Sequence, residues 1–307
     1  ECWRLGGKKF YLTPVLPFAV LLLLAASALG ASFLLPAGSE YLSLTILLLC
    51  CMALPAAFYC KFTGGWTLER MRVRLIDFSG VLFSLVATVV LICLSTLLRL
   101  GLEHYTTASA AERLYGFVLP QTQGNIASVL FRVVVLAILP TILEEFVFHC
   151  VIETELEQNF GAVAAILLSS FYYALTALSV YEFPVSFLVG LLTGVIFCIT
   201  RSVLASGIMH FCYCLYALFL KPYIWEFVAK PDNTTFFVFL AGSLLLLFLI
   251  LTFGEAERLF YRRAIDNAPS PAAQPGFLRM LRNTAALLIS PGTLLCILLF
   301  VLYVLFR

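Results

Sequence analysis

Residues 126–149 read IASVLFRVVVLAILPTILEEFVFH, and this run is apolar enough to cross a lipid bilayer except near its end. There, Glu144 and Glu145 stand side by side. An ionised carboxylate at the centre of a bilayer costs about 2.5–3.5 kcal/mol on insertion scales, so acidic residues at such depth usually face a protein interior and serve a function. The stretch therefore predicts a membrane-spanning helix with a polar site inside it.

Composition extends the membrane assignment to the whole chain. Of the 307 residues, 62% are hydrophobic and 12% are charged, and the mean hydropathy is +1.03. Soluble domains contain about 45–50% apolar and about 25% charged residues. We therefore predict an all-α fold, a polytopic transmembrane helical bundle in which residues 1–307 form a single integral-membrane domain.

The number of spans follows from the length of helix that crosses the hydrocarbon core, about 20 mainly apolar residues. Nine segments qualify, and eight is the alternative, because some of them are short. They are residues 12–36, 41–60, 77–100, 126–149, 162–180, 183–200, 203–220, 234–253 and 284–306. Pro140 and Pro291 fall inside two of these helices, where a missing amide donor should cause a kink.

The distribution of Lys and Arg predicts the orientation. If the nine spans alternate, most of the cations between them lie on one side of the membrane: Arg4, Lys8, Lys9, Lys61, Arg70, Arg72, Arg74, Arg258, Arg262, Arg263, Arg279 and Arg282. The positive-inside rule assigns that side to the cytoplasm. We expect a protein of the plasma or inner membrane with a cytoplasmic N-terminus and an external C-terminus.

Residues 254–283, before the last span, are expected to form a cytoplasmic linker. They combine five of these arginines with Pro269, Pro271 and Pro275, a composition typical of a flexible connection. Arginines at a membrane surface attract anionic headgroups at about 1 kcal/mol each, so membrane lipid is an expected partner. The net charge of +2 gives no indication of a nucleic-acid partner.

Several ionisable side chains should meet inside the bundle. Glu145 and His149 are four residues apart and share a helix face, and Glu153 extends this stripe. His210 lies about seven residues inside the seventh span, roughly 10 Å deep at about 1.5 Å per residue, and can reach the glutamates from an antiparallel neighbour. Because a carboxylate beside an imidazole can act on water as a general base, we expect a polar pocket open to the cytoplasmic leaflet.

Other polar positions have structural interpretations. Glu153, Glu155 and Glu157 should form mainly a solvated helix surface at the cytoplasmic border. Gly190 and Gly194 form a small-xxx-small stripe, which allows two helices to approach closely.

The ten cysteines include no C-x-x-C pair, and no cofactor is expected from them. An alternative is a zinc site built from Glu145, His149, His210 and Cys214, a mixture of ligands that zinc accepts. Their spacing matches no established zinc signature, so the alternative depends on the residue types alone.

Two stretches resemble the CAAX protease and bacteriocin-processing family of membrane proteins. The run EEFVFH at 144–149, followed by NFG at 159–161, is similar to the family's E-E-x-x-x-R segment. The runs FLVGLLTG at 187–194 and TRSVLASGIMH at 200–210 are similar to its F-x-x-G-x-x-x-G motif, its T-x-S-[LI] turn and its final H-x-x-x-N helix. Residues 125–220 thus form a family-like core.

The resemblance implies an intramembrane glutamate-dependent endopeptidase. In the family, the first glutamate and a histidine of the following span activate water, while the last histidine and an asparagine stabilise the oxyanion. Carried over, Glu144 is the expected base, Glu145 orients the site and His210 is the oxyanion donor. Type II CAAX prenyl endopeptidases of this family remove the last three residues of prenylated proteins, so the resemblance implies a prenylated or other membrane-associated peptide as substrate.

Three positions depart from the family's motifs. His149 stands at the arginine position, Ala177 stands where the run from Tyr173 should end in the water-activating histidine, and Cys214 replaces the asparagine. Loss of one general base or one oxyanion donor costs about two to four orders of magnitude in rate. Loss of both predicts little hydrolysis unless His149 or Tyr173 substitutes.

Two alternatives therefore accompany the protease interpretation. A catalytically impaired relative would bind a membrane peptide or protein in the same pocket, as a scaffold or immunity factor. A proton-coupled transporter is the weaker alternative, because the sequence shows no internal repeat of the kind that marks many transporters.

Overall fold

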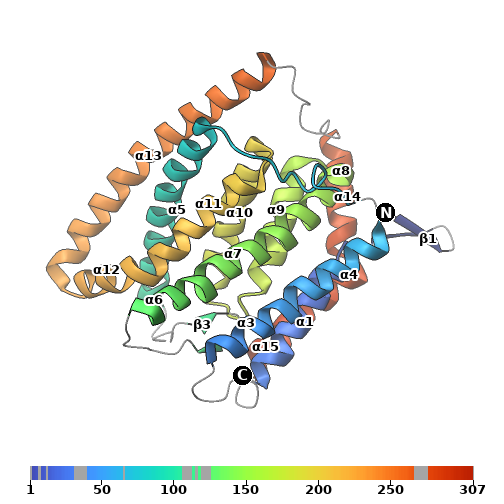
Figure 1. Cartoon of the computed structure of the whole chain (residues 1–307), viewed down its shortest axis with the longest axis horizontal. Helices are drawn as coiled ribbons and strands as arrows, with labels where there is room; N and C mark the ends of the chain where they lie inside the picture. Colours follow the sequence, from blue (N-terminus) through green and yellow to red (C-terminus); the bar gives the residue numbers. More distant parts are fainter. Residues whose placement is uncertain are drawn as a thin grey trace.

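The computed structural model describes residues 2–5, 8–11, 13–30, 40–64, 66–105, 113–114, 117–118, 126–265 and 276–306. Its body is helical, as the composition predicts (Figure 1). Beside the helices there are two short antiparallel hairpins, β1 (Cys2–Leu5) with β2 (Lys8–Tyr11) and β3 (Arg113–Leu114) with β4 (Phe117–Val118). The all-α class therefore holds for the part that can lie in the membrane.

The helices fall into three groups along the chain. The N-terminal group consists of α1 (Val15–Leu29), α3 (Glu40–Leu48), the π-helical η1 (Leu49–Ala53), α4 (Leu54–Thr63) and α5 (Phe78–Tyr105). A continuous rod follows, formed by α6 (Ile126–Val133), π-helical η2 (Val134–Ile138), α7 (Leu139–Glu144), π-helical η3 (Glu145–Glu153) and α8 (Thr154–Phe160). The C-terminal group consists of α9 (Ala162–Leu175), α10 (Phe183–Thr200), α11 (Val203–Leu215), π-helical η4 (Tyr216–Leu220), α12 (Lys221–Val228), α13 (Pro231–Ile265), α14 (Phe277–Leu288) and α15 (Pro291–Phe306).

In the described part of the chain, six helices are long and apolar enough to cross a membrane, and a seventh counts if α14 and α15 form one bent span. Each of the nine predicted segments contains a helix. Two of them, α1 and α9, have only 15 and 14 residues, so a count of eight or nine spans is not confirmed. The predicted kink at Pro291 is present as a 52° bend between α14 and α15.

Much of the predicted linker at 254–283 belongs to helices. Residues 254–265 continue α13, and residues 277–283 belong to α14. The run EAERL at 255–259 consists of strong helix formers, which explains why α13 extends past its apolar part. Pro269, Pro271 and Pro275 lie outside the described residues.

The rod lies between two groups of helices (Figure 1). On one side, α5, α10 and α11 pack together, and α13 runs along the outer side of α5. On the other side, α1 packs against α15, and α4 and η1 contact the rod. The largest fully buried side chains include Phe148 and Phe160 of the rod and Tyr172 of α9. The rod is therefore enclosed by protein, which is the condition for keeping charged groups at membrane depth.

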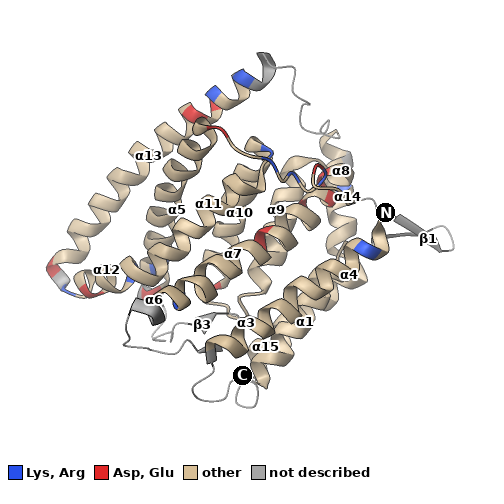
Figure 2. Ribbon diagram, in the orientation of Figure 1, with Lys and Arg blue, Asp and Glu red and all other residues tan. Residues whose placement is uncertain are grey.

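At one end of the bundle, arginines form ion pairs with acidic residues, and Figure 2 colours the positions of both kinds of residue along the ribbon. Arg72, in the connection between α4 and α5, pairs with Glu157 of α8, and Arg201, after α10, pairs with the same carboxylate. Arg262, near the end of α13, pairs with Asp77 at 2.9 Å. Arg72 and Arg262, two of the cations that the sequence assigns to one side of the membrane, thus both form ion pairs at this end, which we call the basic end.

The opposite end has its own polar cluster. Arg99 of α5 makes two hydrogen bonds of 2.6 Å to the carboxylate of Glu182, beside the start of α10. The hydroxyl of Tyr181 donates to Glu103 at 3.2 Å. Burial, together with the negative charge of Glu103, raises the pKa of Tyr181 to about 12. These contacts close the α9–α10 turn against the far end of α5.

Candidate active site

Glu144 and Glu145 lie at the junction of α7 and η3, where the rod changes from α-helical to π-helical hydrogen bonding. A π-helix pairs residue i with residue i+5, is rare, and frequently occurs at functional sites. Both side chains are buried, with exposed fractions of 4% and 2%. The sequence predicts a polar pair on this helix but not the change of helix type, which sets the direction in which each carboxylate leaves the backbone.

His210 bridges the two glutamates. Helix α11 begins after Ser202, whose hydroxyl accepts a hydrogen bond from the N–H of Leu204, and it runs along the α7–η3 junction. Nδ1 of His210 lies 2.9 Å from Oε1 of Glu145, and Nε2 lies 3.2 Å from Oε2 of Glu144. The structure therefore brings together the three residues that the sequence singles out as catalytic candidates.

Tyr173 of α9 completes the surroundings of Glu144. Its hydroxyl hydrogen bonds to this carboxylate, and its ring meets the ring of His210 edge to face, with 6.1 Å between centroids. Cys214, one turn after His210 on α11, interacts with the imidazole. Ala177, in contrast, lies beyond the last residue of α9. Tyr173 is thus the α9 side chain that contacts Glu144.

His149 lies in the protein interior on the same rod. Its Nδ1 is 2.6 Å from Oε2 of Glu153, and its Nε2 is 2.8 Å from the hydroxyl oxygen of Thr193 on α10. Nε2 also lies 3.9 Å from Oε1 of Glu145, the oxygen that binds His210. The two histidines are therefore connected through one carboxylate oxygen, in a continuous series of buried acid and base groups.

The predicted solvated surface of Glu153, Glu155 and Glu157 is wrong. All three side chains are buried, with exposed fractions of 1%, 3% and 3%. Glu153 binds His149 of the same helix, but the partners of Glu155 and Glu157 come from elements far away in the sequence, so spacing along one helix could not reveal them. Glu155, for example, accepts hydrogen bonds from the hydroxyls of Thr13 and Tyr59, at 3.0 and 2.6 Å.

Glu157 binds two arginines that are separated by more than a hundred residues in the chain. Arg72 pairs with Oε2 of Glu157, and its guanidinium lies 4.7 Å from the centre of the Phe197 ring. Arg201 reaches both carboxylate oxygens, at 3.1 and 2.9 Å. Both arginines have positive φ, 56° and 55°, a conformation that costs a non-glycine residue about 1–3 kcal/mol. The ion pairs offset this cost and fix the segment that follows Arg72.

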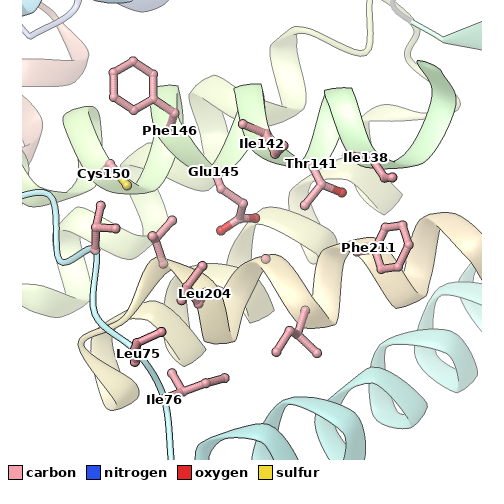
Figure 3. Close-up of a pocket in the computed structure, with 14 residues that line it drawn as sticks. Leu75, Ile76, Ile138, Thr141, Ile142, Glu145, Phe146, Cys150, Leu204 and Phe211 are labelled. Carbon is pink, nitrogen blue, oxygen red and sulfur yellow. The ribbon is translucent and has the colours of Figure 1, made fainter. Parts of the chain in front are cut away.

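That segment forms one wall of a pocket beside the glutamates. The pocket has a volume of about 640 Å³. Its lining comes from residues 73–76, from one face of η2, α7 and η3, and from the facing side of α11 (Figure 3). Glu145 carries the only carboxylate among the lining residues, and its side chain points into the space between the rod and α11 (Figure 3). Glu144 is not part of this lining, so the structure distinguishes the two acids.

The remaining lining is almost entirely apolar and partly open to the surroundings. Ile142 and Leu204, on opposite sides, have exposed fractions of 60% and 40%. Gly207 of α11 faces Thr141, and a Cβ placed on it would still be 3.9 Å from the threonine methyl group. The opening between the rod and α11 can therefore admit an apolar chain from the side.

Thr141 is a functional candidate that the sequence interpretation missed. It lines the pocket one turn before Glu145, it has an exposed fraction of 6%, and its hydroxyl makes no hydrogen bond to any residue that the structure describes. Oε2 of Glu145 likewise has no hydrogen-bond partner in the described part of the chain. The four-residue spacing from Thr141 to Glu145 equals that from Glu145 to His149, so the same helix-face argument could have found it.

The geometry gives no support to the zinc alternative. Within the described ranges, no group of three or more His, Cys, Asp or Glu side chains is arranged to hold a metal ion. Both ring nitrogens of His149 and of His210 already face a carboxylate or hydroxyl oxygen. What the arrangement offers instead is a carboxylate with one oxygen held by an imidazole and the other facing an apolar pocket.

Comparison with known proteins agrees with the motifs. Residues 126–216 match the model of a family described as type II CAAX prenyl endopeptidase Rce1-like. The match begins with the rod and ends at the C-terminus of α11, so it contains Glu144, Glu145, Tyr173 and His210. Neither the curated proteins nor the solved structures compared with the chain gave a significant match. The resemblance read from the motifs is thus confirmed for this segment.

Proposed function

We propose that the chain is a membrane endopeptidase that hydrolyses a peptide bond in a lipidated, membrane-associated peptide. The observation that carries this proposal is the position of Glu145, which supplies the only carboxylate in the lining of an apolar pocket of about 640 Å³, inside the segment that matches the CAAX endopeptidase family. Ligand pockets have volumes of about 300–1,000 Å³ and combine mainly apolar walls with a few polar groups.

The pocket fits the hydrocarbon part of such a substrate. A prenyl or acyl chain would occupy the space between Ile142, Leu204 and Phe211, and its transfer from the bilayer would require no exposure to water. The attached peptide would then place a carbonyl group beside Glu145. An apolar wall also excludes bulk water, which strengthens every electrostatic interaction at the reacting bond.

The reaction needs one base and one donor, and the pocket offers both. Oε2 of Glu145 takes a proton from a water molecule, whose oxygen attacks the carbonyl carbon of the scissile bond. The hydroxyl of Thr141 donates a hydrogen bond to the oxyanion that forms. Glu145 then gives its proton to the leaving nitrogen as the C–N bond breaks, so that a carboxylic acid and an amine result.

This assignment exchanges the roles that the family resemblance implies for the two glutamates. Glu144 contacts His210 and Tyr173 and is not among the residues that line the pocket. We infer that Glu144 and Tyr173 hold His210, and that Nδ1 of His210 binds Oε1 of Glu145 and thereby leaves Oε2 free to react. The carboxylate that faces the substrate is the better base.

We further propose that the basic end faces the cytoplasm and that all nine helical segments contribute to crossing the membrane. Helices α1 and α15 begin side by side, since Sγ of Cys296 lies 4.0 Å from the carbonyl oxygen of Pro14. They therefore run in the same direction, which supports a cytoplasmic N-terminus and an external C-terminus. Reporter fusions at the two termini would test this, and activity of both reporters on the same side would contradict it.

A catalytically silent relative is the second candidate. The observations in its favour are that Ala177 has no side chain that can act as a base and that Cys214 stands one turn after His210, where the family has an asparagine. Such a protein would bind the lipidated peptide in the same pocket without cleaving it.

The test is cleavage of a prenylated reporter peptide by the purified protein in lipid nanodiscs, followed by mass spectrometry. Glu145→Gln should lower the rate by about 10²–10⁴-fold, the usual contribution of a general base. Glu144→Gln, which weakens only the support of His210, should lower it less. Glu255→Gln on α13, outside the pocket lining, is the control and should leave the rate unchanged.

Each outcome has a distinct meaning. Loss of cleavage in Glu144→Gln but not in Glu145→Gln would show that Glu144 is the base. Absence of cleavage in the unmodified protein, together with binding of the peptide, would favour the silent relative. Gly207→Leu, which fills the pocket, should abolish binding of the prenylated peptide; unchanged binding would place the lipid elsewhere.

A further inference from the structure

The hydrogen bonds around His149 determine where its protons lie. The hydroxyl of Thr193 is 2.8 Å from the carbonyl oxygen of Val189 and 3.1 Å from that of Gly190, and both oxygens can only accept. Since a hydroxyl has one proton, the Thr193 oxygen must accept from Nε2–H of His149, at 2.8 Å. This nitrogen is therefore a donor.

The other ring nitrogen faces a carboxylate. Nδ1 of His149 and Oε2 of Glu153 are 2.6 Å apart, a short hydrogen bond in which an ionised carboxylate can only accept. A ring that donates from both nitrogens is an imidazolium. Ser169 supports the arrangement, because its hydroxyl lies 3.4 Å from the same oxygen of Glu153.

A cation at this position acts on Glu145. Nε2 of His149 lies 3.9 Å from Oε1 of Glu145, and both side chains are buried. Two adjacent buried acids such as Glu144 and Glu145 would otherwise repel each other, and one would take up a proton. A fixed positive charge offsets that repulsion and keeps Glu145 able to accept a proton from water.

The packing of α10 leaves space for the His149–Glu153 pair. A Cβ placed on Gly194 would lie 2.9 Å from Oε2 of Glu153 and 3.4 Å from Cε1 of His149. Any larger residue would push Glu153 from its place. The glycine that the sequence assigns to helix packing thus makes room for the second acid–base pair.

From these contacts we propose that His149 and Glu153 are positioning residues of the proposed protease: Glu153 holds a proton on His149, and the resulting cation keeps Glu145 charged and in place beside His210. The proposal rests on the proposed function for its effect on rate. The charged and titratable groups around the pair are Glu145 of η3, Glu157 of α8, His210 of α11 and Arg72 of the 66–77 connection. Two hydroxyls complete the surroundings, Ser169 on α9 and Thr193 on α10.

The protonation state can be measured without any substrate. The chain has three histidines, His104, His149 and His210, so ¹⁵N-histidine labelling gives a spectrum that single substitutions can assign. At pH 7, His149 should show both ring nitrogens protonated. Glu153→Gln keeps the shape of the side chain but removes its charge, and it should convert His149 to the neutral ring. A neutral ring in the unmodified protein, or no change in Glu153→Gln, would overturn the proposal.

The effect on rate is tested beside a matched control. Glu153→Gln should lower kcat about ten- to a hundredfold with KM unchanged, less than the loss of the base itself. Glu155→Gln alters another buried acid two residues away, which binds Thr13 and Tyr59 instead, and it should leave kcat unchanged. An equal loss in both variants would show a general structural effect and contradict the assignment. If the unmodified protein does not cleave at all, the proposed function fails while the histidine spectrum still decides the charge of His149.

Discussion

The rod at Val129–Phe160 and the helix at Asp232–Arg262 both satisfy the length and hydropathy expected of a membrane span, yet they occupy opposite environments. In the most apolar window of each, 78% of the rod is buried inside the protein but only 6% of the other helix. The more apolar of the two is the one that faces outward. Hydropathy identifies spans but does not separate a lipid-facing helix from one that carries a site.

The two helices also satisfy their polar groups differently. On α13, the hydroxyls of Ser243 and Thr252 donate to carbonyl oxygens four residues back in the same helix. Charges on α13 gather toward its ends (Figure 2). On the rod, Glu145 and Glu157 bind groups from other helices and connections. A lipid-facing helix must satisfy its polar groups by hydrogen bonds within the helix itself, whereas an enclosed helix can hold ionisable groups that bind partners on its neighbours.

The largest expected difference concerns the ion pairs of the two helices. Arg72→Ala leaves the buried Glu157 with one cation fewer and should lower the free energy of unfolding by about 3 kcal/mol, as expected when a buried pair is broken. Arg262→Ala removes an ion pair of α13 whose side chains are about half exposed, and the change should be at most about 1 kcal/mol. Heating with a thiol-reactive dye, which reports exposure of the buried cysteines, measures both. Equal shifts would mean that the enclosed pair adds no stability.

A smaller contrast is expected between two threonines. Thr141→Val keeps the shape of this pocket-lining side chain but removes its hydroxyl, and it should lower kcat about a hundredfold if this group stabilises the oxyanion. Thr252→Val removes a hydroxyl on α13 that bonds within its own helix and should not change kcat. Cleavage of the prenylated reporter measures both. A normal rate in Thr141→Val would exclude this hydroxyl as the oxyanion donor.

Much of the fold can be predicted from the sequence, because the hydropathy that identifies membrane spans depends only on local composition. Each of the nine predicted segments contains a helix, and the bend at Pro291 follows from a missing amide hydrogen. The lengths of α1 and α9 cannot be predicted from the sequence in the same way, since the ends of a helix depend on capping residues and packing. The extension of α13 to Ile265 does not follow from hydropathy, because the charged run at 254–265 is as typical of a connection as of a helix end.

The candidate site likewise has features that the sequence predicts and features that it does not. The proximity of Glu144, Glu145 and His210 could be predicted, because acids and a histidine at similar depth in apolar helices have few alternatives to one another. The burial of Glu153 could not, since Ser169, one of its two partners, comes from α9 and is in place only when α9 packs against the π-helical η3. The orientation of Glu145 toward the pocket, rather than Glu144, depends on the same change of helix type.

The smallest expected difference is between substitutions at two glycines, and it tests the packing of α10 against η3. Gly194→Ala places a methyl group 2.9 Å from Oε2 of Glu153, so α10 must move away from the rod, at a cost of about 1–2 kcal/mol for a modest overpacking. Gly242→Ala on α13 adds a methyl group where no described residue lies within 4 Å, and it should be neutral or stabilise the helix by up to about 1 kcal/mol. The thiol-exposure assay measures both changes. Because the shift of α10 also separates Thr193 from His149, Gly194→Ala should lower kcat as well, whereas a variant that loses stability but keeps kcat would show that the site tolerates a looser α10.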